Sequence, residues 1–118
     1  MLLRHSSDML TQEKPHLRDG KGTVTVEHIL NPDELSGKGR LFAIHILPPG
    51  ASIGLHPHDG EIEAYHFLAG KGRYWNNEEV FDVVAGDTTL VDDHNSHGVE
   101  NTGDTPLKFI GLILFTGK

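Results

Sequence analysis

Turn-forming residues recur about every ten residues along this chain, and this regular spacing restricts the folds open to it. Glycine and proline supply many of the turns, with 14 and 6 copies among 118 residues. Between the turns, apolar and polar residues alternate, as in residues 23–30, which is the pattern of a strand with one buried face. Short alternating strands between regular turns are typical of sandwiches and barrels. The sequence therefore predicts an all-β fold.

The predicted strands occupy residues 23–30, 41–47, 52–55, 62–68, 73–75, 79–84, 88–91, 97–101 and 106–115. A short helical turn is expected at residues 32–35, because Pro32 follows a turn signal. The glycine-rich segment 69–72 predicts a hairpin between the strands on either side of it. Apolar and polar residues do not recur with a sustained period in residues 1–20. We interpret this segment as an N-terminal arm that orders on dimerisation, followed by a single domain at residues 21–118.

Composition excludes several kinds of partner and site. The formal net charge of −7 argues against nucleic acid and anionic membrane surfaces, since both attract basic patches. The longest apolar run, residues 109–115, is too short to span a bilayer, and the N-terminus lacks the apolar core of a signal peptide. The absence of cysteine excludes disulfides, thiolate metal sites and a cysteine nucleophile. We expect a cytoplasmic protein that binds a small molecule.

The segment 50–70 carries the strongest chemical signal in a chain that has nine histidines. His56 and His58 are one residue apart, so in a strand both imidazoles point to the same face. Glu63 joins them if the chain turns back after His58. Imidazoles and carboxylates are ligands of divalent transition metals. The segment therefore predicts a metal site that takes a further ligand from elsewhere in the chain.

The spacing of two motifs resembles that of the cupin family. The first motif is Gly50, five residues, His56, one residue, His58, four residues, Glu63, six residues and Gly70. The second motif is Gly86, five residues, Asp92, and then His97, three residues and Asn101. Asp92 stands where the family usually has proline, and His94 stands where it usually has glycine. His97 keeps the position of the fourth ligand.

The resemblance implies a double-sheet jelly-roll barrel that holds one divalent transition metal. The implied ligands are His56, His58, Glu63 and His97. Fe, Mn, Ni, Co and Zn all accept this ligand set, so the sequence does not choose among them. The resemblance also implies a homodimer, and residues 41–47, which are apolar on both faces apart from His45, are consistent with a subunit contact.

Two classes of function fit these features. The first is a metalloenzyme that acts on a small polar substrate with chelating oxygen atoms, of dioxygenase, lyase or isomerase type. The second is a module that binds a small molecule or a metal without catalysis. Because the fold alone does not select a reaction, both classes stay open at this point.

Three further residues are candidates for catalysis, each with a structural alternative. Tyr65 shares the face of Glu63, where it either hydrogen-bonds a ligand or forms part of the core. His45 lies in an otherwise apolar strand, as an acid or base in the pocket or as a core histidine. His94 either relays protons at the pocket mouth or belongs to a solvated loop. Arg40, Lys71 and Arg73 are basic residues near the motifs that can bind an anion or remain solvated.

Overall fold

Ten strands and three short 3₁₀ turns make up residues 1–117, the part of the chain that this computed structural model describes. The strands are β1 (Thr11–Pro15), β2 (Thr23–Leu30), β3 (Gly39–Leu47), β4 (Ser52–His58), β5 (Glu61–Ala69), β6 (Lys71–Asn76), β7 (Glu79–Val84), β8 (Thr88–Val91), β9 (Asn95–Asn101) and β10 (Leu107–Phe115). The 3₁₀ turns are η1 (Ser6–Asp8), η2 (Leu17–Asp19) and η3 (Pro32–Leu35). None of the described helical segments is long and apolar enough to cross a membrane. Strands β2, β7 and β8 and the turn η3 have the bounds predicted from the sequence.

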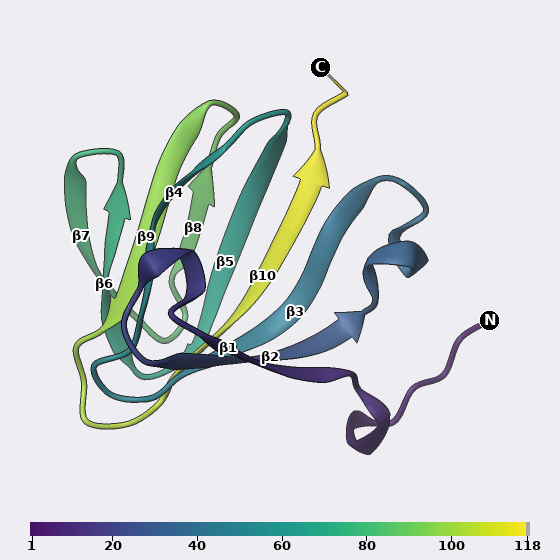
Figure 1. The fold of residues 1–118 in the computed structure, drawn as a ribbon, viewed down its shortest axis with the longest axis horizontal. Coiled ribbons are helices and arrows are strands. Elements are labelled where there is room, and N and C mark those ends of the chain that lie inside the picture. The colour runs from purple at the N-terminus through teal and green to yellow at the C-terminus, as the bar shows by residue number, and fades with distance from the viewer. Residues whose placement is uncertain (118) are drawn as a thin grey trace.

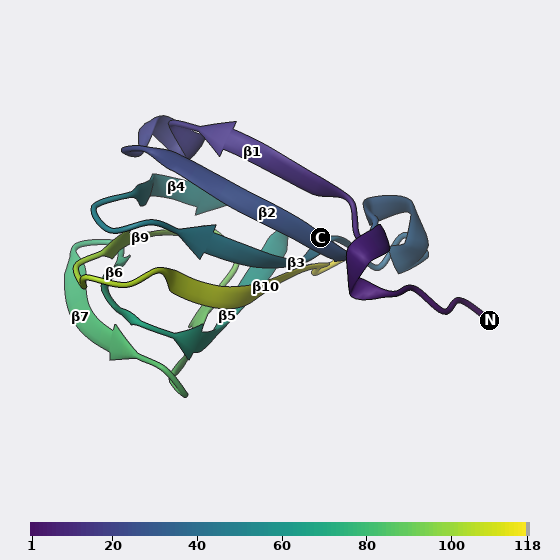
Figure 2. The same ribbon diagram turned by 90° about the horizontal axis from the view of Figure 1, so that it is seen from below.

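The strands form two sheets in which every pairing is antiparallel. One sheet has the order β1-β2-β3-β10-β5-β8, and the other has the order β4-β9-β6-β7. Figure 1 shows the smaller sheet on one side of the molecule and β10, β3 and β2 of the larger sheet on the other, and Figure 2 shows the same layers from below. This double-sheet arrangement confirms the predicted jelly-roll fold.

The core lies between the two sheets, because alternate residues of each strand face inward. On β10, Phe109 and Ile113 are buried, while their neighbours along the strand are partly exposed. Tyr65 and Phe67 of β5 pack against Phe109, with ring centroids 4.3 and 5.2 Å from it. Truncating an aromatic side chain in such a core typically costs about 3–5 kcal/mol. This packing fixes β5, the strand that carries Glu63, in the larger sheet.

The segment 69–72 does not form the predicted hairpin. β5 lies between β10 and β8 in the larger sheet, whereas β6 lies between β9 and β7 in the smaller one. The chain therefore crosses from one sheet to the other at Gly70, which has a φ of +85° and comes so close to Pro106 that a Cβ would lie 2.6 Å from its carbonyl oxygen. A glycine-rich turn signals a change of direction. It does not specify whether the next strand pairs with the last or crosses to the facing sheet.

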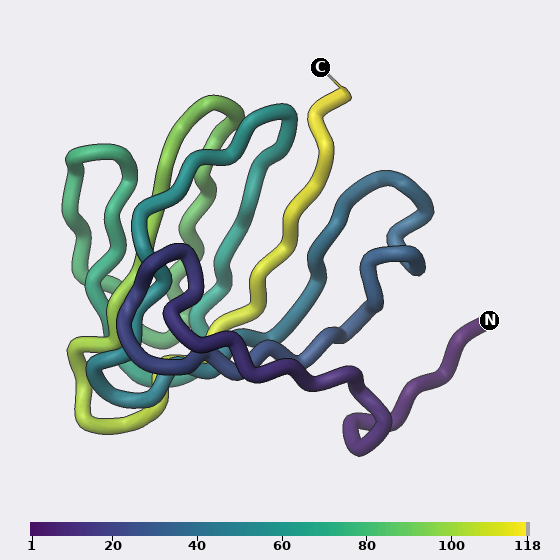
Figure 3. The backbone as a smooth tube through the Cα atoms, viewed as in Figure 1, coloured from purple at the N-terminus to yellow at the C-terminus, as the bar shows by residue number. Residues whose placement is uncertain are grey.

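The N-terminal segment is ordered within the single chain, in contrast to the predicted irregular arm. β1 pairs along its whole length with β2. Its side chains are mostly exposed, so β1 lacks the apolar alternation that would have identified a strand from the sequence. Figure 3 shows the segment crossing in front of the sheets and turning back after β1. The boundary at residue 20 stays a prediction, but residues 11–15 are an edge strand of the larger sheet.

Candidate metal centre

The four residues implied as metal ligands meet in the interior, between the two sheets. They are His56 and His58 of β4, Glu63 of β5 and His97 of β9, and all four are buried. His58 Nε2 and His97 Nε2 each lie close to Glu63 Oε1, at 3.0 and 2.9 Å, and the two nitrogens are 3.0 Å apart. His56 completes a group whose ligand atoms all lie within 4.8 Å of one another. The fold thus produces a buried group able to hold a metal ion.

Strand register explains why these side chains converge. β4 and β9 pair so that His56 lies directly opposite His97. His58 follows two residues later and shares the inward face of β4. The chain then reverses through Gly60, which has a φ of +75°, and returns as β5 with Glu63 facing the same interior. One strand pair and one tight turn therefore position all four donors.

A second set of contacts orients the three imidazoles, because the outward ring nitrogen of each has a partner. The pairs are His56 Nδ1 with the Gly54 carbonyl oxygen at 2.7 Å, His58 Nδ1 with Glu61 Oε1 at 2.6 Å, and His97 Nδ1 with the Tyr74 hydroxyl at 2.7 Å. A ring that carries its proton on Nδ1 presents the lone pair of Nε2 to an ion. The sequence did not identify Glu61 or Tyr74 as part of the site. Only the position of Glu61, three residues after His58, could have suggested it.

Arg40 holds the Glu61 carboxylate in place for its hydrogen bond with His58. Its guanidinium donates two hydrogen bonds to the Glu61 carboxylate, from Nε to Oε2 at 2.7 Å and from Nη2 to Oε1 at 2.6 Å. These bonds lower the pKa of Glu61, so it stays ionised as the acceptor for His58. Such carboxylate–histidine pairs fix the orientation of a ligand ring and raise its basicity. Arg40 was predicted either to bind a substrate anion or to remain solvated, and in the structure it pairs with the Glu61 carboxylate.

The charge states in the group suit a cation. Burial raises the pKa of Glu63, but hydrogen bonds with His58 and His97 outweigh burial and bring the pKa to about 2. Burial lowers the pKa of His56 to about 4, which keeps this ring neutral. Burial also lowers the pKa of His58, but hydrogen bonds with Glu63 and Glu61 outweigh it and raise the pKa overall. An arriving metal ion would take the place of a proton on His58.

The donor spacing is small enough for one ion to reach all of the donors. The three distances among His58 Nε2, His97 Nε2 and Glu63 Oε1 are 2.9 to 3.0 Å. A group of imidazole and carboxylate donors fits a divalent transition metal.

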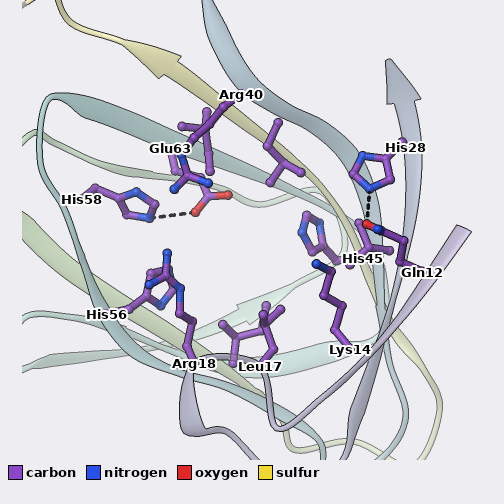
Figure 4. A pocket seen from close by; sticks show the side chains of 14 residues that line it. Gln12, Lys14, Leu17, Arg18, His28, Arg40, His45, His56, His58 and Glu63 are labelled. Carbon is purple, nitrogen blue, oxygen red and sulfur yellow. Dashed lines mark hydrogen bonds and ion pairs between the residues drawn. The ribbon is translucent and has the colours of Figure 1, made fainter. Parts of the chain in front are cut away.

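A cavity of about 250 Å³ opens beside the group (Figure 4). His56, His58 and Glu63 line one part of it, and residues from β1, η2, β2, β3 and β10 line the rest. The cationic and titratable side chains of these other elements are Lys14, Arg18, His28, Arg40 and His45. Lys71 and Arg73 do not line it. Lys14 and Arg18 belong to the segment predicted to be an irregular arm, so they were not predicted to lie at a site.

His45 combines its two predicted positions, in the core and in the pocket. It is 4% exposed, its ring stacks on Phe109 with centroids 4.9 Å apart, and it lines the cavity. Burial lowers its pKa to about 4, and its Nδ1 has no hydrogen-bond partner among the described residues. A Cβ on Gly111 would lie 2.8 Å from His45 Cε1 and 3.3 Å from Glu63 Oε2. The absence of a side chain at position 111 makes room for both groups.

Tyr65 and His94 lie outside the cavity lining. Tyr65 is 1% exposed, and its ring packs against the ring of His97 at a centroid distance of 4.8 Å. Burial and the nearby charge of Glu63 raise its pKa well above the ordinary value. Of its two predicted positions, the pocket mouth and a solvated loop, His94 occupies the loop. It is exposed, pairs with Asp59 at 3.1 Å and donates its backbone N–H to the carbonyl oxygen of His58, because its loop packs on the β4–β5 turn.

Comparisons with known proteins agree with this architecture. Residues 43–114 match the family model of the cupin domain. A protein of Thermotoga maritima named oxalate-binding protein is 41% identical over 92% of this chain and 90% of its own length. An uncharacterized protein of Methanocaldococcus jannaschii is 33% identical over 82% of this chain and 76% of its own length.

A solved structure gives the same result in three dimensions. The crystal structure of a predicted oxalate decarboxylase from Thermotoga maritima superposes with a TM-score of 0.92 and 39% identity, covering 97% of this chain and 99% of that one. The family model covers more than half of the chain, and the ligand motif, the two sheets and the buried donor group agree with it. On this evidence the chain belongs to the cupin family.

Proposed function

We propose that this protein binds one divalent transition-metal ion and, on that ion, a small dicarboxylate such as oxalate. The observation that carries the proposal is the buried group of His56, His58, Glu63 and His97 at the edge of a cavity with cationic walls. The name of the Thermotoga maritima relative, oxalate-binding protein, points to the same class of ligand.

Charge balance in the cavity supports an anionic ligand. The chain has a formal net charge of −7, yet Lys14, Arg18 and Arg40 line this one cavity. Arg40 is paired with Glu61, whereas Lys14 and Arg18 form no ion pair among the described residues. A dianion would find two uncompensated positive charges there in addition to a metal ion. Charge-assisted hydrogen bonds to such groups are among the strongest that a protein offers.

Cavity size also favours a small ligand. A volume of about 250 Å³ lies below the range of about 300–1,000 Å³ that is usual for drug-sized ligands. Oxalate chelates through oxygen atoms on adjacent carbons, so it would bind an ion that keeps two coordination positions free beside the four side chains.

Each part of the cavity has a separate task in this proposal. Glu63 and the neutral imidazoles would hold the ion, which supplies Lewis-acid polarisation of the ligand oxygens when it is bound. The apolar side chains of Leu41, Ile53 and Ile113 line the same space and limit the access of water. A site with little water strengthens the electrostatic attraction between the cationic walls and the ligand.

Carbon–carbon bond cleavage is the second candidate function, since the solved structure similar to this chain is described as a predicted oxalate decarboxylase. Cleavage of oxalate releases carbon dioxide and leaves formate after one proton reaches the remaining carbon. His28 and His45 are buried, line the cavity and each have an unpartnered Nδ1. His45 lies beside Glu63 at Gly111, so it is the candidate carrier of that proton. Formate production by the metal-loaded protein would distinguish a lyase from a binding module.

We further propose that the protein is a homodimer. On the outer face of the larger sheet, β3 and β10 present partly exposed apolar side chains next to one another. They are Phe42, Ile44 and Ile46 of β3, and Ile110, Leu112 and Leu114 of β10. Replacing Ile44 by lysine should convert a dimer to a monomer in analytical ultracentrifugation. A wild-type monomer would contradict the proposal.

The central experiment combines metal analysis with ligand titration. We expect the purified protein to contain close to one equivalent of a divalent transition metal. Calorimetric titration with oxalate should show binding to the metal-loaded protein and none after chelation of the metal. A protein without metal affinity, or one whose oxalate binding survives chelation, would overturn the proposal.

A further inference from the structure

The loop formed by residues 16–20, which we name the η2 loop, is strained beside the cavity. Three of its residues have left-handed backbone angles, with φ of 51° at His16, 52° at Arg18 and 63° at Asp19. Residues with a Cβ rarely adopt this conformation, because the Cβ crowds the following carbonyl oxygen. Such strain persists only where the surroundings impose it, and it is concentrated at ligand sites.

Close backbone packing against β4 imposes the strain. A Cβ on Gly20 would lie 2.0 Å from the carbonyl oxygen of Ser52, and a Cβ on Gly54 would lie 2.0 Å from the carbonyl oxygen of Arg18. The Ser52 backbone N–H also donates to the carbonyl oxygen of Lys21 at 2.9 Å. Two glycines therefore let the η2 loop dock on β4 at a distance that side chains would prevent.

This docking couples the loop to the metal group. The carbonyl oxygen of Gly54 accepts the hydrogen bond from His56 Nδ1 at 2.7 Å, while its Cα hydrogens face the backbone of Arg18. One residue of β4 thus contacts the loop and orients a ligand imidazole.

The side chain of Arg18 lies on the metal side of the cavity. Figure 4 shows it extending from η2 toward the part that His56 lines, whereas Lys14 points to the end where His45 lies. Arg18 is an exposed residue that lines the cavity, and its guanidinium makes no ion pair or hydrogen bond among the described residues. Its planar fork of N–H donors can bond two neighbouring acceptor oxygens at once.

We infer that Arg18, held in place by the η2 loop, binds the outward-facing oxygens of a dicarboxylate chelated at the metal group, and so determines the preference for dicarboxylates. This inference rests on the proposed function and adds a residue and a loop to it. A chelating monoanion such as glycolate lacks the second carboxylate and would gain much less from Arg18.

The first test replaces Arg18 by asparagine, which tolerates the left-handed conformation and removes the guanidinium. Binding of oxalate and of glycolate is measured by calorimetry on protein loaded with Mn(II). We expect oxalate affinity to fall about 10- to 100-fold, as for the loss of a charge-assisted pair of hydrogen bonds, with glycolate affinity nearly unchanged. Metal content should stay at the wild-type level, and the melting temperature should not fall.

The matched control is Arg73→Asn, since Arg73 is an exposed arginine of β6 outside the cavity lining. This variant should bind oxalate as the wild type does. Wild-type oxalate affinity in Arg18→Asn would overturn the inference and leave the proposed function standing. Loss of metal in Arg18→Asn would also overturn it, because Arg18 would then act on the metal group. If the wild type itself does not bind oxalate, the proposed function fails and this inference fails with it.

The second test moves the loop without changing Arg18. Gly20→Ala places a methyl group against the backbone of Ser52, so the η2 loop must lift away from β4. Gly103→Ala is the control, because its Cβ would meet the flexible side chain of Lys71 at 3.1 Å. We expect Gly20→Ala to lower oxalate affinity with metal content retained, and Gly103→Ala to change neither. Unchanged oxalate affinity in Gly20→Ala would show that the docked loop has no part in binding.

Discussion

The cavity has two sides, which differ in burial, in backbone conformation and in the pairing of their charged groups. The ligand side consists of β4, β5 and β9, and its donors are buried, unstrained and fully partnered. The N-terminal side consists of β1 and η2. Its cations, Lys14 and Arg18, form no ion pair among the described residues, and Arg18 lies on strained backbone. A side with satisfied partners is built to hold one ion in a fixed geometry. A side with free charges keeps its binding capacity for a ligand that comes and goes.

The largest expected effect comes from removing a donor on the ligand side. His97→Ala takes away an imidazole that is 0% exposed and 2.9 Å from Glu63. Metal affinity should fall by more than about 100-fold, which exceeds the effect usual for removing a residue that only hydrogen-bonds to a ligand. Metal content after dialysis measures the effect. His66→Ala is the control, since His66 is exposed on β5 and bonds to Thr88. Unchanged metal content in His97→Ala would show that His97 is not a metal ligand and that the ligand side does not hold the ion as proposed.

Gly111→Ala probes the packing between the two sides. Its methyl group would collide with His45 Cε1 at 2.8 Å and approach Glu63 Oε2 at 3.3 Å. Overpacking of this kind typically costs about 1–3 kcal/mol of unfolding free energy. Urea denaturation of the metal-free protein measures the loss. A variant as stable as the wild type would mean that His45 moves freely and is not a fixed wall of the cavity.

Glu61→Gln tests whether the charge of Glu61 contributes to metal binding, because it keeps a hydrogen-bond acceptor for His58 and removes the carboxylate charge. The glutamine oxygen can still accept from His58 Nδ1, but Arg40 loses its ionised partner. We expect metal affinity to fall roughly tenfold, at the lower end of the effects seen when the hydrogen-bond partner of a ligand is changed. Competition with a chromophoric chelator measures this change. A gain in oxalate affinity in the same variant is also expected, since Arg40 would become available to the ligand.

The smallest effect concerns pH. Burial lowers the pKa of His45 from 6.5 to about 4, so between these values the unfolded chain binds a proton that the folded chain does not. Stability is therefore complete above about pH 6.5 and is lost as the pH falls toward 4. The melting temperature of the metal-free protein should drop by a few degrees over this range. In His45→Leu the drop should be smaller, and an equal drop would assign the pH dependence to other groups.

The residues of the ligand side could be predicted from the sequence, because they lie in short segments with a recognisable spacing. His56 and His58 share a strand face by the period of two, Glu63 follows one turn later, and the fixed spacing of His97 completed the motif. The N-terminal side could not be predicted in this way. β1 has no apolar period, and nothing near Arg18 in the sequence signals that its backbone touches Gly54.

By itself the sequence determined the all-β class and the strands with clear alternation, because both depend on periodicity within neighbouring segments. Periodicity also placed His56 and His58 on one strand face, while the full set of four donors came from the resemblance of the two motifs to the cupin family. Only the tertiary structure decided that β5 and β6 lie in different sheets, that His94 packs on a surface turn and that Arg40 holds Glu61. It also decided that the η2 loop lies against β4. These features depend on which surfaces meet after folding, and contacts between distant segments leave no period in the chain.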